Sequence, residues 1–118
     1  MIFILDDEPS ICESTKFLLE VFGFQVKDYT SANLFLSEIK PVDNSCLLLD
    51  LSMPEMHGFQ VKEELVKRQL KLPVIYTSAH CDPDSIQRVR NEGDCFLLKP
   101  YTTEDLLDCI HKFVQVPA

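Results

Sequence analysis

Five polar side chains stand at the ends of apolar runs in this 118-residue chain: Asp6, Asp7, Asp50, Ser78 and Lys99. Three of them are carboxylates, which repel one another by about 1–4 kcal/mol per pair at 4 Å. A hard divalent cation relieves such repulsion, and Mg²⁺ binds through one or two carboxylates, several waters and a phosphate oxygen. A carboxylate can also attack phosphorus to form an aspartyl phosphate. If these side chains meet, they predict magnesium-dependent transfer of a phosphoryl group to a carboxylate.

Lys99 and Ser78 complement the three carboxylates. The Lys99 ammonium is a compact positive charge, and with a metal ion and the Ser78 hydroxyl it would stabilise the charge spread over a transferring phosphoryl group. Each signal is weak alone, because an aspartate at a strand end is more often a cap or turn residue. A lysine before a proline is more often a solvated surface residue. The interpretation therefore depends on whether the fold brings these residues together.

Short apolar runs alternate with helical patterns along the chain, which predicts an α/β domain. Residues 2–5, 46–49 and 95–98 are apolar without alternation, which is typical of parallel strands buried on both faces. Residues 24–29 alternate, which indicates an edge strand, and a further strand begins at Val74 and reaches Ser78. Helices are expected after Pro9, after an N-cap at Ser31, from the end of a loop over residues 51–58 to about Arg68, and over residues 83–92 and 103–113. In the first helix we expect a buried stripe of Ile11, Leu18, Leu19 and Phe22.

Five strands that alternate with five helices predict a single parallel sheet with right-handed crossovers. An edge position for the second strand fits the flavodoxin-like order 2-1-3-4-5, with helices on both faces. Ligands of such sheets bind outside the carboxyl ends of the strands, near the switch point between strands 1 and 3. The five polar side chains follow strands 1, 3, 4 and 5, so the topology predicts that they converge on this edge.

Length and charge restrict the remaining possibilities. The chain has room for one domain, over residues 1–118, and for no output domain beside it. A net charge of −8 argues against direct binding of nucleic acid, which needs a basic face. No apolar run is long enough to cross a membrane and the start does not resemble a signal peptide, so we expect a cytoplasmic protein. Five cysteines without paired spacing indicate small buried hydrophobic residues, and Cys81, in a polar segment, is the one candidate for a reactive thiol.

Four segments around the polar side chains share a pattern with a known family. They are Ile2-Phe-Ile-Leu-Asp-Asp-Glu-Pro9, Leu47-Leu-Leu-Asp50-Leu-Ser-Met-Pro-Glu-Met-His-Gly58, Pro73-Val-Ile-Tyr-Thr-Ser-Ala79 and Phe96-Leu-Leu-Lys99-Pro100. In combination they resemble the receiver domains of two-component response regulators, over the whole chain. Residues 23–32 further resemble receivers that precede a helix-turn-helix DNA-binding domain.

The resemblance implies a role for each polar residue. Asp50 would be the phosphoacceptor, assisted by Lys99 and Ser78. The implied Mg²⁺ site uses Asp7 and Asp50 directly, Asp6 through water, and the backbone carbonyl of Ser52. Ser78 and Phe96 match the switch pair of the family, and the Lys99–Pro100 peptide bond is expected to be cis. His57, in contrast, is expected to be a solvated loop residue.

The implied function is phosphorelay signalling. Asp50 would accept a phosphoryl group from a histidine kinase, a phosphotransfer protein or a small phosphodonor, and the surface formed by residues 83–92, 95–98 and 103–113 would then change. That surface is expected to mediate homodimerisation or partner binding and so to control an output. The expected output is transcription. The domain would be a regulatory phosphoacceptor that assists its own phosphorylation and dephosphorylation, and not an enzyme.

Three other functions fit these residues less well. A flavodoxin would need a glycine- and hydroxyl-rich phosphate loop after the first strand, where Asp6 and Asp7 stand. A haloacid-dehalogenase-type phosphatase would place its nucleophile at that strand and leave Asp50 without a role. A pseudo-receiver, which is an interaction or dimerisation module without phosphorylation, usually lacks part of the acidic cluster or the lysine; here all of them are present.

Overall fold

The computed structural model describes residues 1–80 and 82–115 and contains a five-stranded parallel sheet in the order β2-β1-β3-β4-β5. The elements are β1 (Ile2–Leu5), α1 (Pro9–Val21), β2 (Val26–Tyr29), α2 (Ala32–Glu38), β3 (Cys46–Asp50), α3 (Gly58–Lys67), β4 (Val74–Ser78), α4 (Pro83–Asn91), β5 (Cys95–Leu98) and α5 (Thr103–His111). The predicted fold class and strand order are confirmed. Among these residues, no helix is long and apolar enough to cross a membrane.

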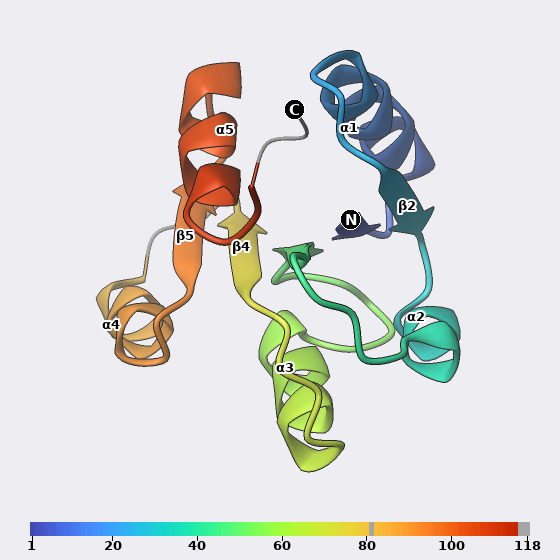
Figure 1. Ribbon diagram of the computed structural model, residues 1–118. Coiled ribbons are helices and arrows are strands. Elements are labelled where there is room, and N and C mark those ends of the chain that lie inside the picture. The colour runs from blue at the N-terminus through green and yellow to red at the C-terminus, as the bar shows by residue number, and fades with distance from the viewer. Residues whose placement is uncertain (81, 116–118) are drawn as a thin grey trace.

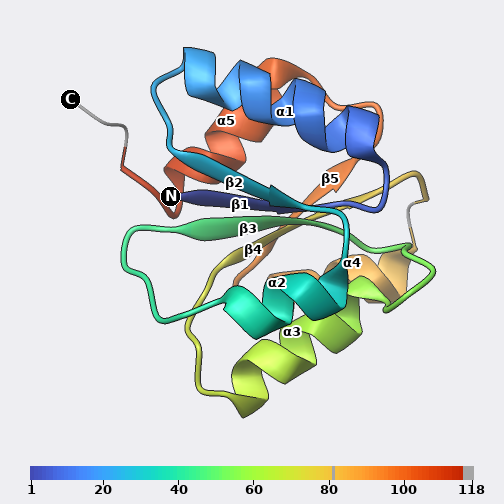
Figure 2. The ribbon, with the colours of Figure 1, turned by 90° about the vertical axis from the view of Figure 1, so that its right-hand side faces the viewer.

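Helices cover both faces of the sheet, as Figures 1 and 2 show. Helices α1 and α5 lie on one face, and α2, α3 and α4 lie on the other. This arrangement explains the apolar runs, because every residue of β1, β3 and β4 is buried. The edge position predicted for β2 is also confirmed, although the strand begins at Val26 and not at residue 24. In this strand Lys27 is exposed while Tyr29 is buried.

The buried stripe predicted for α1 is partly wrong. The helix buries Leu19 as expected, but Ile11 and Leu18 are only partly buried. Its other buried residues are Cys12 and Thr15. Phe22 is 45% exposed, because the helix ends at Val21 and Phe22 follows it as the C-cap. A small thiol and a hydroxyl fit closely against a sheet, so residue size outweighed hydrophobicity at these positions.

Side-chain caps fix where several helices begin. The Ser31 hydroxyl accepts a hydrogen bond from the Leu34 amide at 3.2 Å, which confirms the predicted N-cap of α2.

The predicted ends of α4 and α5 lie one and two residues too far along the chain. These helices end at Asn91 and His111, and the next residues are their C-caps. The predicted burial of cysteine side chains holds for the four in the described part of the chain, Cys12, Cys46, Cys95 and Cys109, which are all free thiols; Cys81 lies outside it.

A buried ion pair joins three segments at the amino ends of β4 and β5. Lys62 Nζ lies 3.1 Å from Asp94 Oδ2, and the two side chains are only 15% and 3% exposed. The other Asp94 oxygen accepts a hydrogen bond from the Val74 amide at 3.0 Å. Lys62 also donates to the Leu72 carbonyl at 3.4 Å. The pair therefore ties α3 to the starts of both strands.

Tyr76 gives a prediction on stability. Its ring packs edge-on against Phe59, with the centroids 5.2 Å apart, but its fully buried hydroxyl has no hydrogen-bond partner among the described residues. A buried polar group without a partner costs about 1–3 kcal/mol. We expect Tyr76→Phe to raise the free energy of unfolding by about 1 kcal/mol in urea denaturation. A loss of stability in the variant would show that the hydroxyl is hydrogen-bonded in solution.

Candidate functional site

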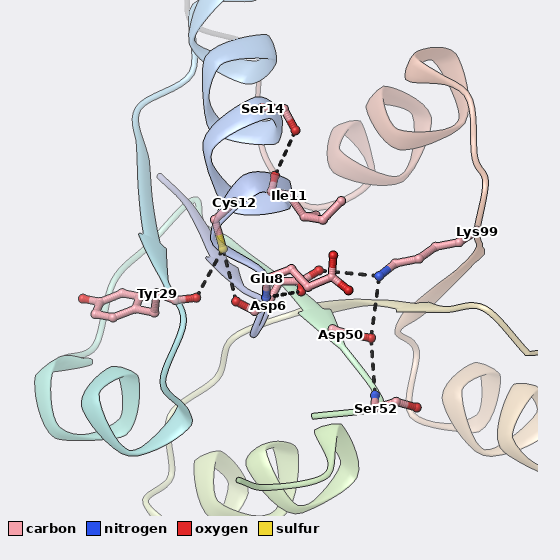
Figure 3. A network of polar contacts seen from close by, with 9 residues as sticks. All are labelled: Asp6, Glu8, Ile11, Cys12, Ser14, Tyr29, Asp50, Ser52 and Lys99. Carbon is pink, nitrogen blue, oxygen red and sulfur yellow. Dashed lines mark hydrogen bonds and ion pairs between the residues drawn. The ribbon is translucent and has the colours of Figure 1, made fainter. Parts of the chain in front are cut away.

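The strand register brings the predicted polar side chains to one edge of the sheet. Leu5 pairs with Leu49, so Asp6 and Asp50 follow at the same height on neighbouring strands. On the other side, Ser78 pairs with Leu98, the residue before Lys99. These are carboxyl ends of parallel strands, and the close-up in Figure 3 shows Asp6, Asp50 and Lys99 pointing toward one another.

The acidic side chains form a tight group. One carboxylate oxygen from each of Asp6, Asp7 and Asp50 lies within 4.8 Å of the other two. Asp6 and Asp50 are buried, whereas Asp7 is exposed. Three hard oxygen donors without a thiol or an imidazole suit Mg²⁺ better than a soft metal. The residues present therefore fit the predicted cation.

Lys99 supplies the positive charge of the site. Its Nζ lies 3.5 Å from Asp6 Oδ2 and 3.8 Å from Asp50 Oδ1. The Lys99–Pro100 peptide bond is cis, as predicted. Backbone amides add further donors, since Ser52 N–H donates to Asp50 at 3.3 Å and Glu8 N–H donates to Asp6 at 3.0 Å (Figure 3). The contacts of Glu8 and Lys99 engage both oxygens of Asp6, whereas those of Ser52 and Lys99 engage only Oδ1 of Asp50, so Asp50 Oδ2 remains for a ligand.

Burial raises the pKa of Asp50 above its ordinary value of 3.8. The Lys99 ammonium opposes this effect and lowers the pKa, whereas the charge of Asp6 raises it further. A raised pKa means that the folded protein binds a proton at Asp50 more readily than the unfolded chain does. The ionised carboxylate therefore destabilises the fold above the raised pKa, and this cost disappears as the pH falls through it.

The sign of this shift predicts how Asp50→Asn affects stability. In metal-free buffer at pH 7, we expect the variant to be more stable than the wild type by about 1 kcal/mol. This is the repulsion between two like charges 4 Å apart in a medium as polar as water. The difference should shrink as the pH falls through the raised pKa. Urea denaturation at several pH values with a chelator measures it. A variant less stable than the wild type at pH 7 would mean that the Lys99 attraction dominates.

Gly58 lets the segment after Asp50 turn sharply back. Its amide donates to the Leu51 carbonyl at 2.9 Å. A Cβ at this position would lie 3.0 Å from Leu51 Cα and 3.1 Å from the Asp50 carbonyl oxygen. A larger residue would therefore push α3 away from the end of β3, so the glycine fixes where the loop of residues 51–57 runs.

The residues predicted to form the switch lie on neighbouring strands, Ser78 at the end of β4 and Phe96 within β5. Ser78 is buried, and its hydroxyl accepts a hydrogen bond from the His80 amide at 3.1 Å. Phe96 is half-buried and packs against the apolar cluster on the α2–α4 face. Thr77 is the register partner of Asp50 and lines, with Tyr101, a cavity of about 10 Å³ beneath the carboxylates. Nothing in the sequence pointed to Tyr101, and strand alternation favoured Ser78 over Thr77.

His57 has a structural role that sequence reasoning missed. It is exposed, as expected for a loop residue, but its Nδ1 accepts a hydrogen bond from the Phe59 amide at 3.1 Å and caps α3. The Gln60 side chain accepts from the His57 amide at 2.9 Å and completes a capping box. The spacing of the glutamine three residues after the cap was the available signal.

Known proteins share this sequence and fold. Residues 2–111 match the response regulator receiver domain. The chain belongs to this family. It is 34% identical to the response regulator protein TmoT of Ectopseudomonas mendocina over 98% of the chain and 53% of TmoT. It is 35% identical to the transcriptional regulatory protein TdiR of Thauera aromatica over 93% of the chain and 49% of TdiR.

The structure of the response regulator StyR superposes with a TM-score of 0.88 and 34% identity, over 97% of this receiver domain and 58% of StyR. The receiver domain thus spans about half the length of the curated relatives that it matches. Membership of this family makes it a regulatory domain of phosphorelay signalling, as the sequence predicted.

Proposed function

We propose that this receiver domain accepts a phosphoryl group on Asp50. The observation that carries the proposal is the group of three carboxylates within 4.8 Å, with Lys99 Nζ at 3.5 and 3.8 Å from two of them. An Asp50 oxygen would attack phosphorus while Lys99 and the Ser78 hydroxyl bind the oxygens of the transferring group. The domain would assist its own phosphorylation and dephosphorylation and turn over no other substrate.

Mg²⁺ is the proposed cofactor. Asp7 and Asp50 would bind it directly, Asp6 through water, and the Ser52 carbonyl would supply a further oxygen. The cation would neutralise the acidic group and bind a phosphate oxygen. The remaining positive charge comes from Lys99, which approaches the two buried carboxylates and leaves the exposed Asp7 free to meet the ion.

Removing one proposed metal ligand should abolish the effect of Mg²⁺ on stability. We expect millimolar Mg²⁺ to raise the melting temperature of the wild type, because an ion that binds only the folded state stabilises it by mass action. Asp7→Asn should lose most of this increase, while its metal-free form should be at least as stable as the wild type. Differential scanning calorimetry with and without a chelator measures both. An unchanged increase in Asp7→Asn would place the ion elsewhere.

The proposed switch connects Asp50 to the α4–β5–α5 surface. A phosphoryl group on Asp50 adds acceptor oxygens that can draw the Ser78 hydroxyl inward. The space so vacated would let Phe96 rotate inward, and α4, β5 and α5 would present a changed face for a homodimer or another partner. Phe96 lines a hollow of about 330 Å³ on this surface together with Ile86 and Leu98, so a change of its rotamer would alter the shape of the hollow.

A histidine kinase or a phosphotransfer protein is the proposed donor, and the proposed location is the cytoplasm. The output is proposed to be transcription, because TdiR is named a transcriptional regulatory protein. The net charge of −8 supports the further proposal that DNA binding, where it occurs, is the task of another domain.

A further inference from the structure

The loop of residues 51–57, which follows Asp50 and includes Ser52, also supports the first turn of α2. One Glu55 oxygen, Oε1, accepts a hydrogen bond from the Asn33 amide at 2.7 Å. The Ser31 hydroxyl lies 3.2 Å from both Glu55 oxygens and donates to this carboxylate. Because the same hydroxyl accepts from the Leu34 amide, Ser31 links Glu55 to the backbone of α2.

Apolar contacts hold this loop against the core, whereas hydrogen bonds hold it against α2. Leu51 and Met53 are buried in the core cluster, and Met56 packs against it. Among the residues that the structure describes, the contacts of Glu55 are the only hydrogen bonds between this loop and α2. The apolar side chains set the depth of the loop, and Glu55 sets its position relative to α2.

The chemistry of this contact suits a charged acceptor. The first amides of a helix have no partner within the helix, and the positive end of its dipole favours a carboxylate. An N–H···O⁻ distance of 2.7 Å is typical of a charge-assisted hydrogen bond, which is stronger than a neutral one. Ser31 supplies one oxygen to this turn, and Glu55 supplies a second from a segment 22 residues away in sequence.

We propose that Glu55 is a positioning residue that couples the Mg²⁺ site to α2. By fixing the loop, Glu55 would hold the Ser52 carbonyl where the ion needs it, and an ion bound at the site would in turn order the first turn of α2. Coupling between two sites is reciprocal, so each effect requires the other. The inference rests on the proposed Mg²⁺ site and adds a residue that does not touch the ion. Figure 2 shows α2 beside α3, which the loop precedes.

Two substitutions separate the hydrogen bond from the charge. Glu55→Ala removes both, whereas Glu55→Gln removes the charge and keeps an oxygen for the Asn33 amide. We expect Glu55→Ala to weaken Mg²⁺ binding by roughly fivefold, the lower end of typical coupling between sites, and Glu55→Gln to restore much of it. Glu13→Ala, which removes an exposed carboxylate from α1, is the control for net charge and should leave binding nearly unchanged. Isothermal titration calorimetry on the folded variants measures the affinities.

The amides of α2 give a second measurement that does not depend on phosphorylation. In the wild type, Mg²⁺ should slow hydrogen exchange of the Asn33 amide, as followed by NMR, and in Glu55→Ala it should not. Ser31→Ala removes only the hydroxyl contact of Glu55 and keeps that of the Asn33 amide. Because Glu55→Ala already removes both contacts, adding Ser31→Ala to it should weaken Mg²⁺ binding little further. Additive losses would overturn the coupling, as would wild-type affinity in Glu55→Ala. A wild type that binds no Mg²⁺ would overturn the proposed metal site, and the coupling with it.

Discussion

Incubation with acetyl phosphate and Mg²⁺ should add one phosphoryl group to the wild-type chain and none to Asp50→Asn. The substitution keeps the shape of the side chain but replaces the nucleophilic carboxylate with an amide, which does not form an acyl phosphate. Asp50 is also the carboxylate that Lys99 and the Ser52 amide both approach, at 3.8 and 3.3 Å. We therefore expect complete loss of uptake in a folded protein, with intact-protein mass spectrometry as the measurement.

Asp28→Asn is the matched control for this experiment. Asp28 lies on the edge strand β2 and pairs with Lys16 at the surface, 3.7 Å away, so the same chemical change occurs outside the site. The control should take up phosphate like the wild type. Uptake of a phosphoryl group by Asp50→Asn would mean that the acceptor is Asp6 or Asp7 instead. A wild type that takes up no phosphoryl group, either from acetyl phosphate or from a phosphorylated histidine kinase, would favour an interaction module without phosphorylation.

The largest loss of stability is expected for Asp94→Ala. The substitution leaves the Lys62 ammonium in a buried place without its carboxylate, and it removes the acceptor of the Val74 amide. Breaking a buried ion pair by removing one partner typically costs about 3–5 kcal/mol. Chemical denaturation should therefore show a loss of this size. The stability of Asp94→Asn, which keeps an oxygen for the Val74 amide, should lie between that of the wild type and that of Asp94→Ala.

A surface ion pair provides the comparison for this second prediction. Asp28 and Lys16 are 33% and 37% exposed, and such pairs contribute about 0–1 kcal/mol. Asp28→Ala should consequently cost less than about 1 kcal/mol. If Asp94→Ala lowered the free energy of unfolding no more than Asp28→Ala does, the Lys62–Asp94 pair would not hold the amino ends of β4 and β5 together.

The group of acidic residues at the sheet edge could be predicted from the sequence, because the strand order alone brings these residues together. Once residues 2–5 and 46–50 are parallel neighbouring strands, Asp6 and Asp50 must meet at their carboxyl ends, and the same logic brings Lys99 to them. The residue types then restrict the chemistry to a hard cation and a phosphoryl group. Strand order, the carboxyl ends of the strands and the acidic group could all be predicted in this way.

Side-chain contacts that do not follow from the strand order could not be predicted. Nothing near Glu55 indicates that it reaches the first turn of α2, and nothing near Asp94 indicates Lys62 as its partner. Phe22 shows the opposite error, since a hydrophobic residue at helical spacing became exposed where the helix ended. These outcomes depend on how neighbouring elements pack, and a pattern within one element carries no information on that.

The two edges of the sheet differ in how they would meet another polypeptide. Every edge strand offers backbone groups to a foreign strand, and charged side chains discourage such pairing. On β2, Lys27 and Asp28 stand in the middle of four residues, and Lys27 pairs with Glu38 at 3.2 Å. β5 has the sequence Cys-Phe-Leu-Leu, with Leu98 46% exposed and no charge. Protection against intermolecular strand addition is thus built into the β2 side, and the β5 side must be shielded by the elements around it.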